Sequence, residues 1–421
     1  MSRRIPGQDI LLARSFAEVQ ADGEARTRSL EARVKMGLVK TLAALGNGVL
    51  WVMGSALFTR ATKAGRVKHI VAYTHGILGD NVVHLPTLAA LKRGFPNASL
   101  HLVTDMVGAP EAAGDLFLRT DFIDAVTVIR GQPFLRKGRR LVLDPALADL
   151  RADLFVNLSP YGNRGWFKAV VREVLFARRL GARRAAGFRL STKRIHRRFN
   201  DVQHAFILNE PRRGDRVLRE LGIEPVAARD TIPRDAAVAA RVRDLLRSDG
   251  VNPDNFIVLN PGGNLEIKHW GVERFGELAA RLVSECGADV VITGMATERG
   301  IAQRVVAAGR GRVFDYAGRT SVGELIELLG MSRLCVSNDT GTMHVAALIE
   351  VPTVGIFGTR FHPSWWFPRG QRVTAIYRFV PCSFCFLDQC GHRSCLEGVD
   401  VETVFAAARS ALYETGTGDG S

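Results

Sequence analysis

From Val67 onward, short apolar runs alternate with amphipathic stretches of helical period. HIVAYT and ASLHLVTD predict strands, and the NVVHLPTLAALKRGF segment between them predicts a helix. AVTVI and LFVNLSP predict two further strands. Fully apolar strands separated by helices are typical of a parallel sheet that is covered on both faces. The pattern therefore predicts an α/β domain over residues 67–234.

The same alternation restarts after Glu210–Arg234, a segment with three prolines that we interpret as the interdomain linker. The strands expected beyond it are FIVLNPG, ADVVITG, VFDYAG, LCVSND and PTVGIFG. The expected helices cover Val272–Cys286, Glu298–Ala308, Val322–Met331 and Thr342–Ile349. Residues 235–400 are thus predicted to form a second domain, and residues 401–421 a terminal helix and a disordered tail. The predicted fold class is α/β, with two doubly wound, Rossmann-like domains that face a cleft.

Residues 1–66 are predicted to form an extension ahead of the first domain. Residues 1–35 are polar and are expected to be partly helical. The stretch Thr41–Thr59 has no charged residue and has basic residues on both sides. Three interpretations are open: a helix lying in a membrane interface, a membrane-spanning helix, or a helix packed on the globular body.

The chain carries 57 Lys and Arg residues against 42 Asp and Glu residues, a net charge of +15. Such a charge predicts an anionic partner, which could be nucleic acid, a phosphorylated ligand or a membrane surface. Basic residues are concentrated between Arg164 and Arg198, where Glu173 is the one acid. This stretch suits a solvated or membrane-facing surface, or an acceptor that carries phosphate or acidic sugars. The candidate contacts to such an acceptor are Arg183, Arg184 and Arg189. Because aromatic residues are not interleaved with the basic ones and no DNA-reading motif is present, no nucleic-acid partner is expected.

Polar residues follow directly after a predicted strand of the second domain. LCVSND leads into Asp339-Thr340-Gly341 and then into a helix whose first turn contains His344. Ligands of parallel sheets bind beyond the carboxyl ends of the strands, and a helix N-terminus attracts phosphate. Thr340 could donate a hydrogen bond, and Gly341 allows a ligand to approach the backbone closely. The alternative is that Asp339 only caps the helix and His344 is an ordinary surface residue.

Two other strand ends indicate the same kind of ligand. FIVLNPG ends in Gly262 and is followed by Gly263, Asn264 and Lys268, and this lysine could bind a diphosphate. ITGMATERG ends another strand and contains Glu298, which could accept hydrogen bonds from ribose hydroxyls. Neither a GxGxxG motif nor a P-loop is present at these strand ends, so the pattern favours neither NAD binding nor ATP hydrolysis.

Four of the six cysteines are clustered late in the chain, at Cys382, Cys385, Cys390 and Cys395. A C-x2-C pair with two more cysteines is a plausible zinc set. However, the second pair has four residues between its cysteines, and all four lie in one short loop. Two interpretations are therefore open, a metal site and a loop of packed thiols.

The stretch SNDTGTMHVAALIEVPTVGIFG resembles the ADP-heptose:lipopolysaccharide heptosyltransferases, glycosyltransferase family 9. GILGDNVVHLPTLAALKRGFPNASLHLVT and NPGGNLEIKHWGVERFGELAARL extend the resemblance from about Val67 to Leu412. The resemblance implies the GT-B fold and an inverting, metal-independent transfer without a cofactor. The ADP-sugar donor would bind the second domain, and an anionic, lipid-linked acceptor would bind the first. The resemblance also implies a protein bound peripherally to the cytoplasmic face of the inner membrane.

The resemblance assigns roles to individual residues. It implies donor contacts from Lys268, Asp339, Thr340, Gly341 and His344. It places Glu298 and Thr320 near the nucleoside. It also implies that Asp80, in GILGDNVV, is the catalytic base, whereas the residues alone would also allow a helix cap. The residues before Asp80, YTHGI, depart from the small-hydroxyl pattern of the family, and His75 is the expected acceptor contact there.

Other functions remain open. The same chemistry could act on another donor or acceptor, such as a capsule or O-chain precursor. A sugar-nucleotide epimerase of the same fold would convert the donor without an acceptor. A non-catalytic scaffold would bind ADP without turnover.

Overall fold

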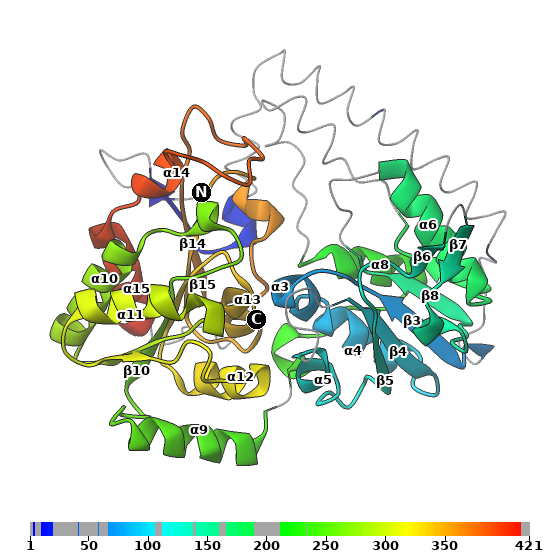
Figure 1. The fold of residues 1–421 in the computed structure, drawn as a ribbon, viewed down its shortest axis with the longest axis horizontal. Coiled ribbons are helices and arrows are strands. Elements are labelled where there is room, and N and C mark those ends of the chain that lie inside the picture. The colour runs from blue at the N-terminus through cyan, green and yellow to red at the C-terminus, as the bar shows by residue number, and fades with distance from the viewer. Residues whose placement is uncertain are drawn as a thin grey trace. The chain divides into compact units, whose positions relative to one another are not determined.

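The structure is a computed structural model that describes residues 3–4, 10–19, 41, 58, 66–105, 112–137, 140–159, 166–188, 211–232 and 234–413. The chain separates into two compact units. The N-terminal unit is Thr27–Pro233, and the C-terminal unit combines Met1–Arg26 with Arg234–Ser421. Each unit is built around a sheet with helices packed against it (Figure 1).

The C-terminal unit contains an eight-stranded sheet. In spatial order its strands are β1 (Arg3–Arg4), β2 (Ile10–Ala13), β15 (Val373–Arg378), β14 (Thr353–Phe357), β13 (Cys335–Asn338), β10 (Phe256–Asn260), β11 (Asp289–Ile292) and β12 (Val313–Asp315). The strands from β15 to β12 are parallel, whereas β1 and β2 are antiparallel to their neighbours. The helices of this unit are α9 (Ala236–Ser248), α10 (Val272–Cys286), α11 (Arg299–Gly309), α12 (Val322–Met331), α13 (Gly341–Leu348), α14 (Ser394–Glu397) and α15 (Val401–Tyr413).

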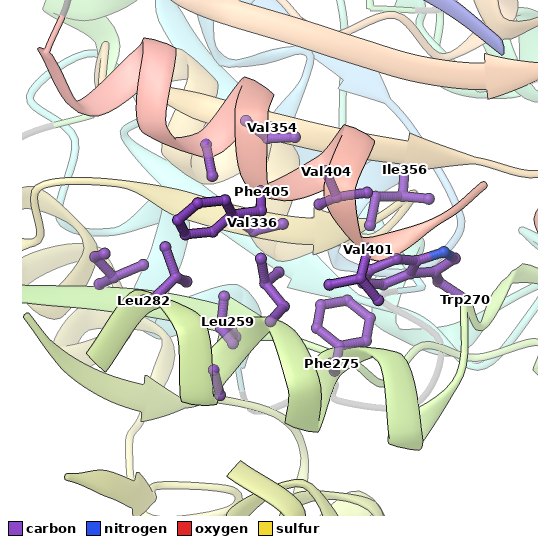
Figure 2. Packing of buried hydrophobic residues seen from close by; sticks show 14 of the residues in the cluster. Leu259, Trp270, Phe275, Leu282, Val336, Val354, Ile356, Val401, Val404 and Phe405 are labelled. Carbon is purple, nitrogen blue, oxygen red and sulfur yellow. The ribbon is translucent and has the colours of Figure 1, made fainter. Parts of the chain in front are cut away.

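Helices α10, α11 and α15 pack their apolar faces on one side of this sheet. In α10 the residues Phe275, Leu278, Ala279 and Leu282 recur at helical spacing and are fully buried. They meet strand residues such as Leu259 and residues of α15 in one core cluster (Figure 2). The remaining helices α9, α12 and α13 pack against one another. Because both faces of the strands are covered, the apolar runs in the sequence are continuous rather than alternating.

Strand β2 lies next to β15, although about 360 residues separate them in sequence. Ile10, Leu11 and Ala13 are buried, and Leu11 is the register partner of Tyr377. The sequence analysis did not predict this strand, whereas residues 16–19 are helical, as a partly helical tail allows. The apolar run ILLA is short enough to be overlooked in a polar segment, and its strand conformation comes from pairing with a distant edge.

The N-terminal unit contains a five-stranded, fully parallel sheet. Its strands in spatial order are β5 (Ala125–Val128), β4 (Ser99–Thr104), β3 (His69–Tyr73), β8 (Leu154–Asn157) and β9 (Arg184–Ala186). A separate antiparallel hairpin consists of β6 (Phe134–Lys137) and β7 (Arg140–Leu143). The helices are α3 (Leu78–Val82), α4 (Leu85–Gly94), α5 (Ala112–Phe117), α6 (Trp166–Arg179) and α8 (Arg213–Leu221).

Two helices of the N-terminal unit differ from the sequence prediction. The single helix expected after β3 is divided into α3 and α4, because Pro86 has no N–H group and restricts the residue before it. Helix α8 lies inside the segment that we interpreted as a linker. Its buried residues Val217, Leu218 and Leu221 show that this segment belongs to the packed body of the unit.

The strands and helices expected in the second half of the chain are confirmed. Each of the five expected strands corresponds to one of β10 to β14, and the expected helix bounds agree with α10 to α13 within one residue. In the part of the chain that the structure describes, no helix is long and apolar enough to cross a membrane. The uncharged stretch Thr41–Thr59 lies outside the described residues except for Thr41 and Phe58, and the tail after residue 413 lies outside them entirely.

We predict that Leu11→Ala destabilises the C-terminal unit by about 2–4 kcal/mol, because it leaves a cavity between β2 and β15. The control is Leu387→Ala, since the Leu387 side chain is 47% exposed and its truncation should cost less than about 0.5 kcal/mol. Urea unfolding of both variants measures the difference. Equal destabilisation would contradict the placement of Leu11 in the core.

Candidate functional site

The candidate site of the C-terminal unit lies at the carboxyl edge of its sheet. Strands β10, β11 and β13 end at Asn260, Ile292 and Asn338, and the loops after them supply most of the expected donor residues. Parallel register brings these strand ends to the same edge. The sequence-based expectation of a shared site is therefore compatible with the fold of this unit.

Lys268 and Asp339 come together across two of these loops. The Lys268 Nζ atom is 2.8 Å from Asp339 Oδ2, and their side chains are only 17% and 13% exposed. The short 3₁₀ turn Glu266–Lys268 holds the lysine, and Asp339 follows β13 directly. Partial burial makes this pair stronger than a typical surface ion pair. The ammonium group is thus fixed beside the start of α13.

Thr340 uses its hydroxyl to connect strand ends. Its Oγ1 donates to Asn260 Oδ1 at 2.9 Å and lies 3.0 Å from Ser337 Oγ. This contact ties the end of β10 to the end of β13. The hydroxyl proton expected to be available to a ligand is therefore used within the protein, and only its acceptor lone pairs remain for another partner.

The sequence analysis missed Asn338, which organises the whole edge. Its Nδ2 donates to the carbonyl oxygens of Pro261 at 2.7 Å and Gly262 at 3.0 Å. Its Oδ1 accepts from the Trp270 backbone N–H at 3.1 Å. The side chain is fully buried. A signal was present, because a buried amide immediately before Asp339 in an apolar strand needs several hydrogen-bond partners.

Glu298 also has a different local role from the expected one. Its Oε1 accepts from the Gly263 backbone N–H at 2.5 Å, and its Oε2 accepts from the Met295 backbone N–H at 2.7 Å. A Cβ atom at Gly262 would lie 2.5 Å from this carboxylate, so a glycine is needed there. Glu298 therefore joins the loops after β10 and β11, and a contact to ribose would have to share its oxygens.

Helix α13 begins at Gly341, with Thr340 as its N-cap residue. His344 lies in its first turn and is 3% exposed. Burial lowers the pKa of His344, Asp339 opposes this effect and Lys268 adds to it, and together they bring the pKa to about 4. The imidazole is therefore neutral near pH 7. Among the described residues its Nδ1 atom has no hydrogen-bond partner.

The remaining expected donor residues lie nearby or at the rim. Asn264 is exposed in the loop after β10, two residues before the 3₁₀ turn Glu266–Lys268 begins. Thr320 is half-buried and directly precedes Ser321, the N-cap residue of α12. Their roles stay predictions, since their positions allow a ligand contact without requiring one.

In the N-terminal unit, Asp80 lies at the start of α3, which follows β3. Its Oδ2 accepts from the Ile77 backbone N–H at 2.9 Å, so it caps the helix. Gly76 has φ of +124°, and a Cβ atom there would collide with the Asp80 carboxylate. The Gly76 N–H donates to Asp105 Oδ1 at 2.7 Å. The glycine thus allows Asp80 and the end of β4 to close around one turn.

The expected acceptor residues do not come together. His75 follows the carboxyl end of β3, close to Gly76. Arg184 begins β9 and is level with Leu154 and Ile70, the amino ends of β8 and β3. Arg183 directly precedes it. These arginines therefore lie at the opposite edge of the sheet from His75 and Asp80.

Burial lowers the pKa of Arg184, which lines a cavity of about 580 Å³ together with residues such as Arg93 and Phe95. Arg189 lies outside the described residues. For Arg183 and Arg184 the acceptor role stays a prediction, one that their place at the amino edge disfavours.

The cysteine loop contains four reduced thiols. Cys382 is exposed, whereas Cys385, Cys390 and Cys395 are half-buried. Burial raises the pKa of Cys395. Across the described ranges, no group of three or more His, Cys, Asp and Glu side chains is placed to hold a metal ion. Both interpretations of the loop, a metal site and packed thiols, stay predictions.

Comparison with known proteins finds a family model that matches part of this chain. Residues 227–395 match the family model described as glycosyltransferase family 9 (heptosyltransferase). Lipopolysaccharide heptosyltransferase 3 of Escherichia coli is 24% identical over 300 residues, which are 68% of this chain and 82% of that protein. Lipopolysaccharide heptosyltransferase 1 of Pseudomonas aeruginosa is 28% identical over 138 residues, which are 33% of this chain and 38% of that protein.

Solved structures share the fold. A family 9 glycosyl transferase from Veillonella parvula DSM 2008 superposes with a TM-score of 0.60 at 20% identity, over 85% of this chain and 100% of that chain. The E. coli ADP-heptose LPS heptosyltransferase II superposes with a TM-score of 0.57 at 16% identity, over 82% and 98%. The predicted fold class, GT-B with two Rossmann-like units, is confirmed. Residues 227–395 therefore match the glycosyltransferase family 9 model, and 68% of the chain is similar to a lipopolysaccharide heptosyltransferase.

Proposed function

We propose that the protein transfers heptose, or a related sugar, from an ADP-sugar to a lipopolysaccharide-type, lipid-linked acceptor, with inversion and without a metal ion. The observation that carries the proposal is the Lys268–Asp339 pair at the start of α13. Similarity to known proteins supports heptose as the sugar and lipopolysaccharide as the acceptor. The relatives are named as lipopolysaccharide heptosyltransferases, and the name of one solved structure includes ADP-heptose.

The donor diphosphate would bind where α13 begins. The first N–H groups of a helix have no partner within the helix, and its dipole places partial positive charge there. Lys268 adds a full positive charge held at the same place by Asp339. Neutral His344 adds no charge, and its imidazole could serve as a hydrogen-bond donor or acceptor to a phosphate oxygen.

Departure of ADP needs no general acid, because the diphosphate leaves as a stable anion. The Lys268 ammonium and the helix N-terminus would stabilise the negative charge as it develops on the leaving group. These groups supply positive charge of the kind that a divalent cation provides in other phosphate chemistry. We therefore propose a metal-independent transfer.

The acceptor hydroxyl must lose a proton as it attacks the anomeric carbon. For inversion, the base must act on the face opposite the leaving group, as it does in inverting glycoside hydrolases. We propose Asp80 for this role, because it is a half-buried carboxylate held rigidly at the carboxyl edge of the N-terminal sheet. Its hydrogen bond to Ile77 fixes its orientation, which favours a positioned base over a mobile side chain.

Binding of candidate donors tests this function directly. We expect ADP-heptose to raise the melting temperature of the full chain more than UDP- and GDP-sugars do. Incubation with ADP-heptose and a rough-type lipopolysaccharide should add one heptose to the acceptor, as read by mass spectrometry. Conversion of the donor without acceptor would instead indicate an epimerase. ADP binding without any turnover would indicate a scaffold.

We predict that Lys268→Ala weakens ADP binding by about 1.5–3 kcal/mol, because a partly desolvated charge-assisted contact is lost. Isothermal titration calorimetry measures the affinity. Lys92→Ala is the matched control, since it removes an ion-paired lysine of the other unit. Unchanged ADP affinity in Lys268→Ala would exclude the lysine from the donor site.

We predict that Asp80→Asn lowers turnover by about 10²–10⁴-fold, the usual contribution of a positioned base. The amide can still accept from the Ile77 N–H, so ADP affinity and melting temperature should stay nearly constant. Asp121→Asn, which changes an exposed acid of the same unit, is the control. Turnover close to that of the parent would make Asp80 a helix cap only.

We predict that association with anionic vesicles depends on the uncharged stretch Thr41–Thr59 and its basic flanks. The sharper experiment replaces residues 41–59 by a Gly/Ser linker of equal length, because deletion from the N-terminus would also remove β2 from the C-terminal sheet. The variant should keep ADP binding and lose sedimentation with vesicles. Retained sedimentation would point to the basic stretch Arg164–Arg198 instead.

A further inference from the structure

A carboxyl group is buried beneath the carboxyl edge of the N-terminal sheet. Glu173 lies in the middle of α6 and is 3% exposed, although every other charged residue of the basic stretch Arg164–Arg198 is an arginine or lysine. Its Oε2 accepts a hydrogen bond from Asn157 Nδ2 at 2.7 Å. Buried carboxyl groups with no structural ion pair are rare, so this one calls for an explanation.

Asn157 connects Glu173 to the end of the sheet. It is the last residue of β8, and its Oδ1 accepts from the Ser159 backbone N–H at 3.1 Å. The adjacent Leu158 N–H donates to the Tyr73 carbonyl oxygen at 2.7 Å. The Asn157 side chain therefore holds the turn after β8, and the Leu158 backbone connects that turn to the end of β3. The chain continues from β3 directly into the turn that carries Asp80.

Two hydroxyl groups at these strand ends are fully buried. Among the described residues, neither Thr74 Oγ1 nor Ser159 Oγ has a hydrogen-bond partner. A buried hydroxyl group without a hydrogen-bond partner costs folding free energy. This edge of the sheet therefore holds polar groups whose hydrogen-bonding capacity is not fully used. Such a group of side chains can exchange hydrogen-bond partners when a nearby group gains or loses a proton.

The charged and titratable groups around Glu173 come from each element packed on it. Burial raises the pKa of Glu173 to about 7, against the opposing effects of the Asn157 hydrogen bond, Arg213 of α8 and Arg172 of α6 itself. Tyr73 of β3 faces it, and burial together with Glu173 and Asp105 raises the pKa of the Tyr73 phenol. Burial also raises the pKa of Asp105, against the Gly76 hydrogen bond and the nearby His75. Glu173 therefore changes charge close to neutral pH.

We propose that Glu173 is a positioning residue for the acceptor, which acts through Asn157 on the ends of β8 and β3 and makes acceptor binding depend on its protonation state. The inference rests on the proposed function, because it takes the acceptor to bind at this edge. Ionised Glu173 accepts the Asn157 hydrogen bond more strongly than protonated Glu173 does, so the charged form holds Asn157 and the turn after β8 in place. Protonation weakens this bond and loosens the alignment of both strand ends.

The kinetic test compares the parent with Glu173→Gln, using ADP-heptose and rough-type lipopolysaccharide between about pH 6 and 8. We expect the acceptor KM of the parent to fall at least about fivefold over this range, the lower end of typical couplings between linked equilibria. Glu173→Gln cannot ionise and can still accept from Asn157, so its KM should keep the low-pH value. Asp80 and the acceptor phosphates titrate in both proteins, and the difference between them isolates Glu173.

Glu220→Gln is the matched control. Glu220 is an exposed acid of α8 whose Oε2 accepts from the Gly187 N–H at 3.1 Å, at the end of the neighbouring strand β9. The Glu220→Gln variant should show the same dependence of the acceptor KM on pH as the parent. Asn157→Ser is the second variant, because removing the amide donor disfavours the charged form of Glu173. It should shift the inflection of the acceptor KM to higher pH.

Stability against pH reports on Glu173 without any substrate. Its pKa is raised in the folded state, so the stability that it contributes is present below about pH 4.5 and is lost as the pH rises to about 7. The melting temperature of the parent relative to Glu173→Gln should fall over that range and then stay constant.

A falling melting-temperature difference with identical KM profiles in the parent and Glu173→Gln would overturn the positioning role while leaving the proposed function intact. A melting-temperature difference between the parent and Glu173→Gln that does not change with pH would show that Glu173 does not titrate in this range, and would overturn the proposal. Failure of the parent to transfer heptose at any pH would overturn the proposed function, and this inference with it. If Glu173→Gln does not fold, an unshifted inflection in Asn157→Ser overturns the proposal.

Discussion

The loops after β10 and β13 carry the proposed donor-binding residues. Their geometry depends on how the backbone groups at the ends of these parallel strands find hydrogen-bond partners. Backbone groups that leave a buried sheet must find partners, because each unpaired one costs about 1–3 kcal/mol. Asn338 supplies them by donating to Pro261 and Gly262 and accepting from Trp270. One amide thereby fixes the loop after β10 and the turn that presents Lys268. Without that constraint, the lysine would stand on a mobile loop.

The charge balance of the donor side follows from this fixed geometry. Lys268 and Asp339 are brought within ion-pair distance by two loops that the asparagine side chains hold in place. The pair keeps an ammonium group partly desolvated next to a helix N-terminus, where it interacts strongly with an anion. Burial at the same place keeps His344 neutral. A diphosphate would thus meet one full positive charge, the helix dipole and a neutral imidazole.

The N-terminal unit solves the same problem with different groups. Asn81 donates to the carbonyl oxygens of Gly76 at 3.1 Å and Ile77 at 2.9 Å, and its Oδ1 accepts from Thr104 at 2.8 Å. Asp105 holds the Gly76 N–H. Here the edge carries carboxyl groups whose pKa values burial raises, whereas the edge of the other unit carries a lysine. In the proposed mechanism, rigid strand ends would position a base in one unit and an anion-binding lysine in the other.

Much of this could be predicted because the determining information is local. Hydrophobic period distinguishes strands from helices within about ten residues, so β10 to β14 and α10 to α13 are readable along the chain. A polar residue after an apolar strand marks the carboxyl edge, and Lys268, Asp339 and Asp80 are found at such edges. These positions follow from the topology of any parallel sheet.

The tertiary structure decided what depends on distant partners. Strand β2 forms only because β15 offers an open edge. Arg184 and Glu173 belong to one basic stretch of the sequence. In the fold, Arg184 lies at the amino edge of the sheet, whereas Glu173 of α6 contacts Asn157 at the carboxyl edge. Glu298 turns toward backbone N–H groups that come from another loop. The sequence by itself determined the elements and the residue types at their ends, because periodicity and turn chemistry act between neighbours. Strand order, burial and hydrogen-bond partners arise between residues far apart in sequence, and only the packed fold brings those together.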